Sequence, residues 1–169
     1  MSNKLPFYER PDLTPYLVHL TKNTRAKDKY SAYDNLLSIL KTGKIFGTES
    51  YVRGPSKVAC FMDIPFASLK YILNAENCDK KTPRYEPYGV VVSKKSAYKQ
   101  GCRPVLYLSD EEVRLLRIPR SEVWRPVAFD GIGDRIVSWV HEREWRCRGD
   151  FELPTEIVAV LVPHLRTAQ

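Results

Sequence analysis

The sequence predicts an α+β protein with a mixed, mostly antiparallel β-sheet and short flanking helices. Segments typical of strands gather after residue 88, and the helical segments are short. Strands and helices do not alternate strictly, so the repeated strand–helix–strand order of a doubly wound fold is not expected. The glycine-rich motifs G-x-G-x-x-G and G-x-x-x-x-G-K-[ST] are both missing, which argues against those two ways of binding a nucleotide.

The first half of the chain is predicted to hold three strands and two helices behind a loosely ordered lead-in. The lead-in covers residues 1–15, and a single α+β domain is expected over residues 16–169. Strand formers predict strands over residues 16–21, 44–47 and 57–62, and apolar stripes predict helices over residues 35–42 and 66–73. The expected caps are Ser31 or Asp34 for the first helix, with Gly43 at its end, and Asp63 for the second, with Pro65 in its first turn.

The second half is predicted to be richer in strands. They are expected over residues 88–92, 103–108, 123–129 and 156–162, the last of them buried. Ser93 is expected to cap a short helix that ends at Gly101. Ser109 and Glu112 have the spacing of a capping box, which predicts a helix through Leu116. Residues 77–87 are predicted to form a surface loop, and residues 130–134 a glycine-rich turn.

Composition is typical of a folded, soluble protein. A length of 169 residues suits one domain, and 43% apolar with 28% charged residues excludes a disordered chain. The net charge of +7 favours an acidic partner such as nucleic acid. No apolar stretch approaches the ~20 residues that a membrane span needs, so no membrane partner is expected.

The cysteines do not have the spacing of a metal site. None belongs to a C-x-x-C pair, and no His-x-x-x-His accompanies them, so no metal is expected. They are far apart in the sequence and no signal peptide precedes them, which predicts reduced thiols and a cytoplasmic location. The four are Cys60, Cys78, Cys102 and Cys147.

The densest group of charges lies in residues 140–150, where two glutamates, three arginines, a histidine and a tryptophan follow one another closely. If this run is a strand, its side chains alternate between two faces. One face would hold Glu142, Glu144, Arg146 and Arg148, and the other His141, Arg143, Trp145 and Cys147. Two interpretations remain open: a carboxylate held among arginines that binds a ligand, or an exposed, salt-bridged edge strand.

Two further places hold candidate binding residues. His19 lies in an apolar strand, either as a core histidine bonded to a backbone carbonyl or as a donor to a ligand, and Thr21 would face the same side. Tyr51 and Arg53 lie in a loop that is either a solvated turn or a phosphate clamp. Since the chain has few histidines and no G-x-S-x-G, acyl transfer is not expected.

Four short motifs occur together in a fixed order. They are Leu17-Val18-His19-Leu20-Thr21, Asn35-Leu36-Leu37-Ser38-Ile39-Leu40 with Gly43, Cys60-Phe61-Met62-Asp63-Ile64-Pro65-Phe66, and Glu142-Arg143-Glu144-Trp145-Arg146 with Gly149-Asp150. Over residues 16–163 this ordered set resembles the AbiGi-type abortive-infection family of bacterial phage resistance. It is more distantly similar to the DarT-like ADP-ribosyltransferases.

The resemblance implies a split β-sheet that binds NAD as a substrate in a cleft between two small sheets. It assigns His19 to the nicotinamide ribose and Glu144 to the catalytic acid, with Glu142 beside it on the same strand face. It matches Arg53 to an arginine that handles phosphate and the acceptor. Thr21, Tyr51 and Arg146 would complete the dinucleotide site. A carboxylate fixed near the anomeric carbon would stabilise the positive charge that develops as nicotinamide leaves.

Three functional hypotheses follow. The first is an NAD-dependent ADP-ribosyltransferase of a phage-defence or toxin–antitoxin system, with nucleic acid as the acceptor. The second is a non-enzymatic, antitoxin-like partner of a cognate protein, for which an exposed apolar patch is expected. The third is a nucleic-acid-binding module with a basic face.

Overall fold

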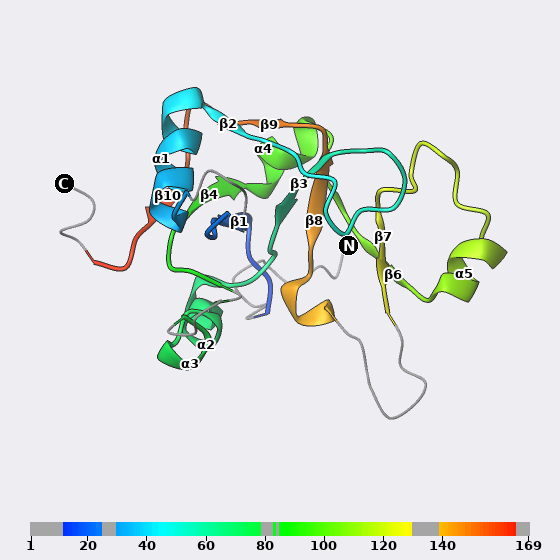
Figure 1. Cartoon of the computed structure of the whole chain (residues 1–169), viewed down its shortest axis with the longest axis horizontal. Helices are drawn as coiled ribbons and strands as arrows, with labels where there is room; N and C mark the ends of the chain where they lie inside the picture. Colours follow the sequence, from blue (N-terminus) through cyan, green and yellow to red (C-terminus); the bar gives the residue numbers. More distant parts are fainter. Residues whose placement is uncertain (1–11, 25–29, 79–82, 84, 130–138, 165–169) are drawn as a thin grey trace, which may run out of the picture.

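The structure, a computed structural model of the whole chain, shows a mixed α+β protein with mostly antiparallel sheets and short helices (Figure 1). It describes residues 12–24, 30–78, 83, 85–129 and 139–164. Most of the predicted lead-in and the predicted turn at residues 130–134 lie outside these ranges. No helix in the described ranges is long and apolar enough to cross a membrane.

Two three-stranded antiparallel sheets form the centre of the molecule. The first has the order β1 (Tyr16–Leu20), β4 (Gly89–Ser93), β10 (Ala159–Leu161), and the second the order β3 (Val58–Phe61), β8 (Trp145–Arg148), β5 (Arg103–Pro104). One residue pair joins them at the β1–β3 boundary, where the Val18 and Met62 backbones exchange hydrogen bonds of 2.9 and 2.7 Å. The strand layer is therefore nearly continuous from β10 to β5.

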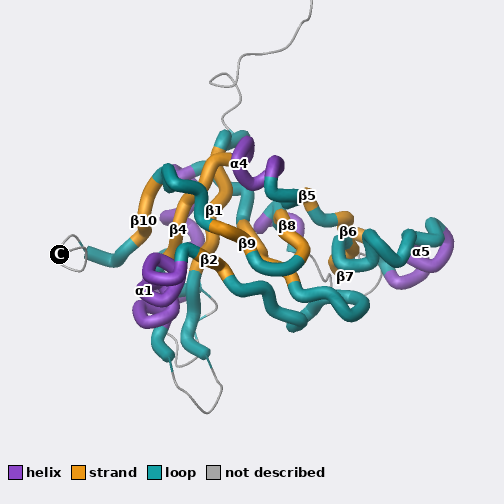
Figure 2. Tube along the Cα trace, turned by 90° about the horizontal axis from the view of Figure 1, so that it is seen from above, coloured by secondary structure: helices purple, strands orange, loops and turns teal. Residues whose placement is uncertain are grey.

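Two small sheets and the helices surround this layer. The small sheets pair β2 (Lys44–Ile45) with β9 (Phe151–Glu152), and β6 (Leu106–Leu108) in parallel with β7 (Pro126–Ala128). The helices are α1 (Ala32–Thr42), α2 (Leu69–Ile72), α3 (Ala75–Cys78), α4 (Lys94–Lys99) and α5 (Asp110–Leu115), with 3-10 turns η2 (Phe66–Ser68) and η3 (Val140–Glu142). Both views place α1 and α5 at opposite ends of the molecule, so β6, β7 and α5 form a lobe away from the core (Figures 1 and 2).

The core lies on one face of the strand layer. Strand alternation sends Leu17 of β1 and Phe61 of β3 to the same side, where Phe61 meets Phe151 edge to face at 4.9 Å between ring centroids. Helix α1 adds Leu36 and Ile39 to this buried cluster. The opposite face of the strand layer carries the Cys60 side chain, and the charged side chains gather on that face.

The helix caps follow the local sequence signals. Ser31 caps α1 in a full capping box with Asp34, and Gly43 ends α1 with a φ of 67°. The predicted caps at Ser93 and Ser109 are also confirmed. The predicted cap at Asp63 is wrong, since η2 has no side-chain cap and the Asp63 carboxylate instead binds Lys94. The predicted helix over residues 66–73 is a 3-10 turn followed by one α-helical turn.

Three predicted strands are shorter than expected. The segment 103–108 divides at Val105 into β5 and β6, and the segment 123–129 is a strand only in β7. The segment 156–162 is a strand only in β10, and it is not buried, because Val160 is 39% exposed at the free edge of the sheet. Hydrophobicity alone does not distinguish a covered strand from an edge strand.

Candidate pocket at one edge of the sheet

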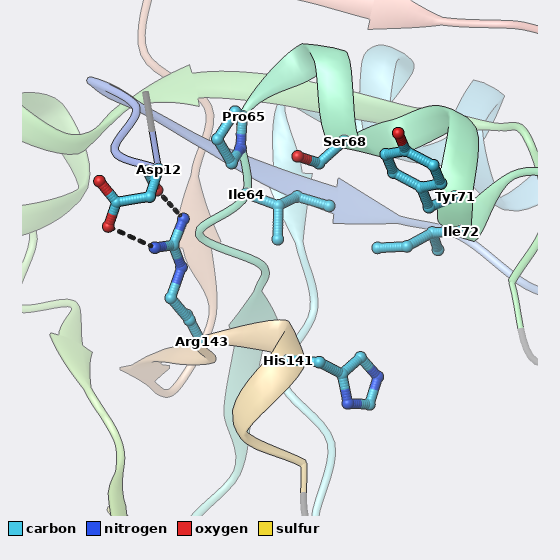
Figure 3. Close-up of a pocket in the computed structure, with 8 residues that line it drawn as sticks. All are labelled: Asp12, Ile64, Pro65, Ser68, Tyr71, Ile72, His141 and Arg143. Atoms are coloured by element: carbon cyan, nitrogen blue, oxygen red, sulfur yellow. Dashed lines mark hydrogen bonds and ion pairs between the residues drawn. The ribbon is translucent and has the colours of Figure 1, made fainter. Parts of the chain in front are cut away.

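A pocket of about 370 Å³ opens where three strand ends meet (Figure 3). Strand β1 runs antiparallel to β3, and β3 runs antiparallel to β8. The start of β1, the end of β3 and the start of β8 therefore lie at the same edge of the strand layer. The turns η2 and α2 form its far wall. Its lining residues are Asp12, Ile64, Pro65, Ser68, Tyr71, Ile72, His141 and Arg143.

Arg143 supplies the positive charge of the pocket. Its Nε donates to the Asp63 carbonyl oxygen at 2.7 Å, and its Nη2 donates to the Asp12 carbonyl oxygen. Its Nη1 lies 3.6 Å from the Asp12 carboxylate, and its side chain remains 32% exposed. The backbone of Arg143 is left-handed, with φ 44° and ψ 52°, a strained conformation that in non-glycine residues often marks a functional site.

This left-handed residue corrects the predicted strand over residues 140–150. Residues 140–142 form η3 and only residues 145–148 form a strand, so Glu142 and Glu144 do not share a strand face. The turn at Arg143 leaves Glu142 beside Tyr85 and His141 and leaves Glu144 beside Arg146.

A tyrosine, a glutamate and a histidine meet beside the pocket. The Tyr85 hydroxyl donates to Glu142 Oε1 at 2.6 Å and lies 3.2 Å from His141 Nε2. Because that hydroxyl has one proton and donates it to Glu142, His141 Nε2 must be the donor in the second contact. Tyr85 thereby holds a carboxylate that is 19% exposed and an imidazole that is 51% exposed next to one another.

Asp63 fixes the floor of this region. Asp63 is 8% exposed, and its Oδ2 accepts from Lys94 Nζ at 2.8 Å and from Trp145 Nε1 at 3.3 Å. Its backbone N–H donates to the Glu142 carbonyl oxygen at 3.1 Å. Its Oδ1 is buried without a partner among the described residues. Asp63 therefore joins the end of β3 to both sides of the Arg143 turn.

Glu144 lies away from the pocket in a buried ion pair. Its carboxylate accepts from Arg146 Nε at 2.8 Å and Nη2 at 3.4 Å, and the two residues are only 9% and 4% exposed. Arg146 also donates to the carbonyl oxygens of Trp124 at 2.8 Å and Tyr51 at 3.3 Å. The Tyr107 hydroxyl accepts from the Glu144 backbone N–H at 2.9 Å. This geometry gives both side chains a structural role, holding the base of the β6–β7 lobe.

His19 lies on the core face of the strand layer, opposite to the face that carries Glu144. Its Nδ1 is 2.8 Å from the Cys60 carbonyl oxygen, and its ring meets Phe61 in the core at 5.8 Å between centroids. Burial lowers the pKa of His19, partly offset by the bond to Cys60. The Cys60 side chain points the opposite way, where burial and then the nearby Glu144 carboxylate raise the pKa of its thiol. The structure thus does not place His19 and Glu144 across one crevice.

The other predicted site residues also lie apart from the pocket lining. Thr21 is buried and donates to the Ala32 carbonyl oxygen at 2.7 Å, which fixes the start of α1. Arg53 forms an ion pair with Asp110 of α5. Tyr51 is 96% exposed, in a left-handed conformation with φ 59°.

Five polar pocket residues were not predicted as ligand contacts: Asp12, Ser68, Tyr71, His141 and Arg143. His141 and Arg143 belong to the densest charged run, so a signal was present, but a strand reading pointed them away from the glutamates. Ser68 and Tyr71 have no comparable signal, because an isolated serine or tyrosine in an amphipathic segment is ordinarily structural.

No family of known proteins, no curated protein and no solved structure matches this chain. No group of three or more histidine, cysteine, aspartate or glutamate residues that could hold a metal ion occurs in the described ranges.

Proposed function

We propose that the chain is an NAD-binding ADP-ribosyltransferase-like protein of a bacterial phage-defence or toxin–antitoxin system, with this pocket as the dinucleotide site. One observation carries the proposal: a guanidinium, an imidazole, two hydroxyl side chains and the Asp12 carboxylate line one cavity, and the Glu142 carboxylate lies 4.0 Å from the imidazole. A volume of about 370 Å³ lies within the range of small-molecule sites. The proposal moves the acid from Glu144 to Glu142.

Arg143 suits a phosphate group. A guanidinium forms two parallel hydrogen bonds to phosphate oxygens, and such charge-assisted bonds are strong. The present partner of Nη1 is the carboxylate of Asp12, whose side chain is 73% exposed and 3.6 Å away. Such exposed pairs contribute little, so a pyrophosphate would displace this contact readily.

Tyr71 and the apolar wall suit a planar ring. The Tyr71 side chain is 70% exposed at the rim, and Ile64 and Ile72 line the cavity beside it. Aromatic faces stack on bases without requiring one sequence or one ring type. Ser68 adds a hydroxyl for a ribose or phosphate oxygen.

Glu142 supplies the negative charge that the reaction needs. In the transfer, the bond between nicotinamide and the ribose breaks and its electron pair leaves with nicotinamide. The acceptor's lone pair then forms the new bond to the anomeric carbon, and the acceptor's proton passes to the Glu142 carboxylate. A carboxylate held by Tyr85 stabilises the developing positive charge more than the ground state. The net charge of +7 favours nucleic acid as the acceptor.

A second candidate is a non-enzymatic, antitoxin-like regulator with the same fold. The observation that favours it is that the residues first assigned to the catalytic acid and to the nicotinamide ribose already have partners, since Glu144 is paired with Arg146 and His19 contacts the Cys60 carbonyl oxygen. The two candidates differ in one measurable property, the transfer of label from NAD.

The test measures NAD binding by calorimetry and transfer of label from NAD to DNA, RNA and protein. Arg143→Gly is the sharpest binding variant, because glycine adopts the left-handed conformation of residue 143 without strain while losing the guanidinium. We expect Arg143→Gly and Tyr71→Ala to weaken NAD binding. Tyr98→Ala removes an exposed tyrosine that does not line the pocket, and it should leave NAD binding unchanged.

Glu142→Gln separates binding from chemistry. We expect this variant to keep its fold and bind NAD but to lose label transfer. Binding without any transfer in the unaltered protein would favour the regulator. An absence of measurable NAD binding by the unaltered protein would overturn both the site and the function.

A further inference from the structure

We propose that the tip of α5 is a docking surface for a protein partner that presents an apolar groove rimmed by aspartate and glutamate side chains. The α5 tip is defined by Arg114, Leu115, Leu116, Arg117 and Arg120. It lies at the far end of the β6–β7 lobe, at the opposite end of the molecule from α1 (Figures 1 and 2).

Two adjacent leucines are left uncovered at this tip. Leu115 ends α5 and is 72% exposed, and Leu116 follows it and is 60% exposed. These are the most exposed aliphatic side chains among the large exposed hydrophobic residues in the described ranges. A single exposed leucine is ordinary, whereas a pair at the end of a projecting lobe indicates a contact surface.

Arginines surround the leucines and set the charge of the partner. Arg114, Arg117 and Arg120 are all exposed, and none forms an ion pair with an acid in the described part of the chain. The acids of the first turn are already engaged in part, since Asp110 pairs with Arg53 and Glu112 accepts from the Ser109 backbone N–H at 2.7 Å. Asp110, Glu111 and Glu112 all lie in the first turn of α5, whereas the tip itself carries three arginines and no acid, so complementarity favours an acidic rim on the partner.

Local backbone geometry and the bonded lobe base set the position of the tip. Arg117 has a left-handed φ of 47°, which fixes the chain direction directly after the leucines. The backbone and side chains of the buried Glu144–Arg146 pair bond the base of the lobe through Tyr107 and Trp124. A surface that is ordered before binding loses less conformational entropy on association.

The alternatives to a protein partner fit less well. Helix α5 has six residues, too few for an amphipathic helix lying in a membrane interface. Nucleic-acid surfaces use basic groups with aromatic or polar contacts to bases, whereas the centre of this surface is two aliphatic side chains.

The test uses a labelled synthetic helical peptide with a leucine and phenylalanine stripe flanked by glutamates, measured by fluorescence anisotropy. Peptides with glutamine or lysine in place of glutamate are the matched probes, and phosphatidylglycerol vesicles and single-stranded DNA represent the other classes. Sedimentation of the protein alone reports self-association. We expect the glutamate peptide to bind best, and its binding to weaken with salt.

The variants locate the surface. We expect Leu115→Ser with Leu116→Ser to weaken peptide binding by about tenfold or more, since each buried leucine contributes substantially. Arg114→Gln with Arg120→Gln should reduce the preference for glutamate over glutamine peptides. The control is Leu40→Ser on α1, 39% exposed at the other end of the molecule, which should change nothing.

Several results would overturn the proposal. They are equal binding of all three peptides, an equal loss in Leu40→Ser, binding of vesicles or DNA alone, no binding at all, or a dimer that the leucine substitutions dissociate. NAD binding, measured on the same variants, should be unaffected, so failure here is distinguishable from failure of the pocket.

Discussion

Replacing Glu144 by alanine should destabilise the protein strongly while leaving the pocket intact. The carboxylate is the ion-pair partner of Arg146, and the guanidinium is 4% exposed. Removing one member of a buried pair leaves an uncompensated charge, which costs roughly 3–5 kcal/mol. For a chain of 169 residues, each kcal/mol lowers the Tm by about 2–4 °C, so a fall of about 6–20 °C is expected.

The assay is urea unfolding with a thermal melt on the same samples. Glu152→Ala is the matched control, because it removes an exposed glutamate paired with Lys44 at 2.7 Å, and exposed pairs contribute little. Glu144→Met with Arg146→Met should recover part of the lost stability, since the uncompensated charge disappears, although the Trp124 and Tyr51 carbonyl oxygens lose their donor. A Glu144→Ala protein with unchanged stability and lost NAD-dependent activity would refute the structural assignment and return Glu144 to the chemistry.

Three further predictions concern the fold. Gly89→Ala should lower the urea concentration at the midpoint of unfolding, because an added Cβ would lie 2.3 Å from the His19 carbonyl oxygen. Burial lowers the pKa of His19 below its unfolded value of 6.5, so the folded state binds fewer protons, and stability should fall as the pH drops below about 6.5. His19→Asn should reduce that dependence in melts at pH 5.5 and 7.5, and an unchanged slope would contradict it. Ser31→Ala should lower the free energy of unfolding in urea by about 1 kcal/mol, because the Asp34 N–H loses its acceptor. Ser38→Ala, at an exposed position of α1, should not lower it.

The features that the sequence predicted correctly depend on neighbouring residues. The capping box of Ser109 and Glu112 was predicted from their spacing, and Ser31 was one of two caps predicted for α1, where it forms a capping box with the other, Asp34. Gly43 ends α1 for an equally local reason, since the last turn needs a left-handed residue. The α+β class follows from the same short-range patterns.

The site depends on contacts between residues that are far apart in the sequence, and no local pattern specifies such contacts. The face on which His19 lies relative to Glu144 is fixed by the Val18–Met62 bridge and by the β3–β8 register, both of which are long-range. The strand reading of residues 140–150 was wrong because Arg143 adopts a left-handed conformation, which a non-glycine residue seldom does. One residue in that conformation was enough to separate two glutamates that the sequence placed together.

The short segment from Glu142 to Arg146 therefore joins two networks that face different parts of the molecule. Glu142 and Arg143 hold the pocket edge through Tyr85 and Asp63, whereas Glu144 and Arg146 hold the lobe that carries α5. Between them, Trp145 bonds the Asp63 carboxylate and packs against the core, so this side chain resists movement. The Asp63 N–H donates to the Glu142 carbonyl oxygen at 3.1 Å, two residues before the buried ion pair begins at Glu144. The fold thus joins the two networks through five consecutive residues, and the lobe that carries α5 is bonded to this segment by hydrogen bonds at Tyr107 and Trp124.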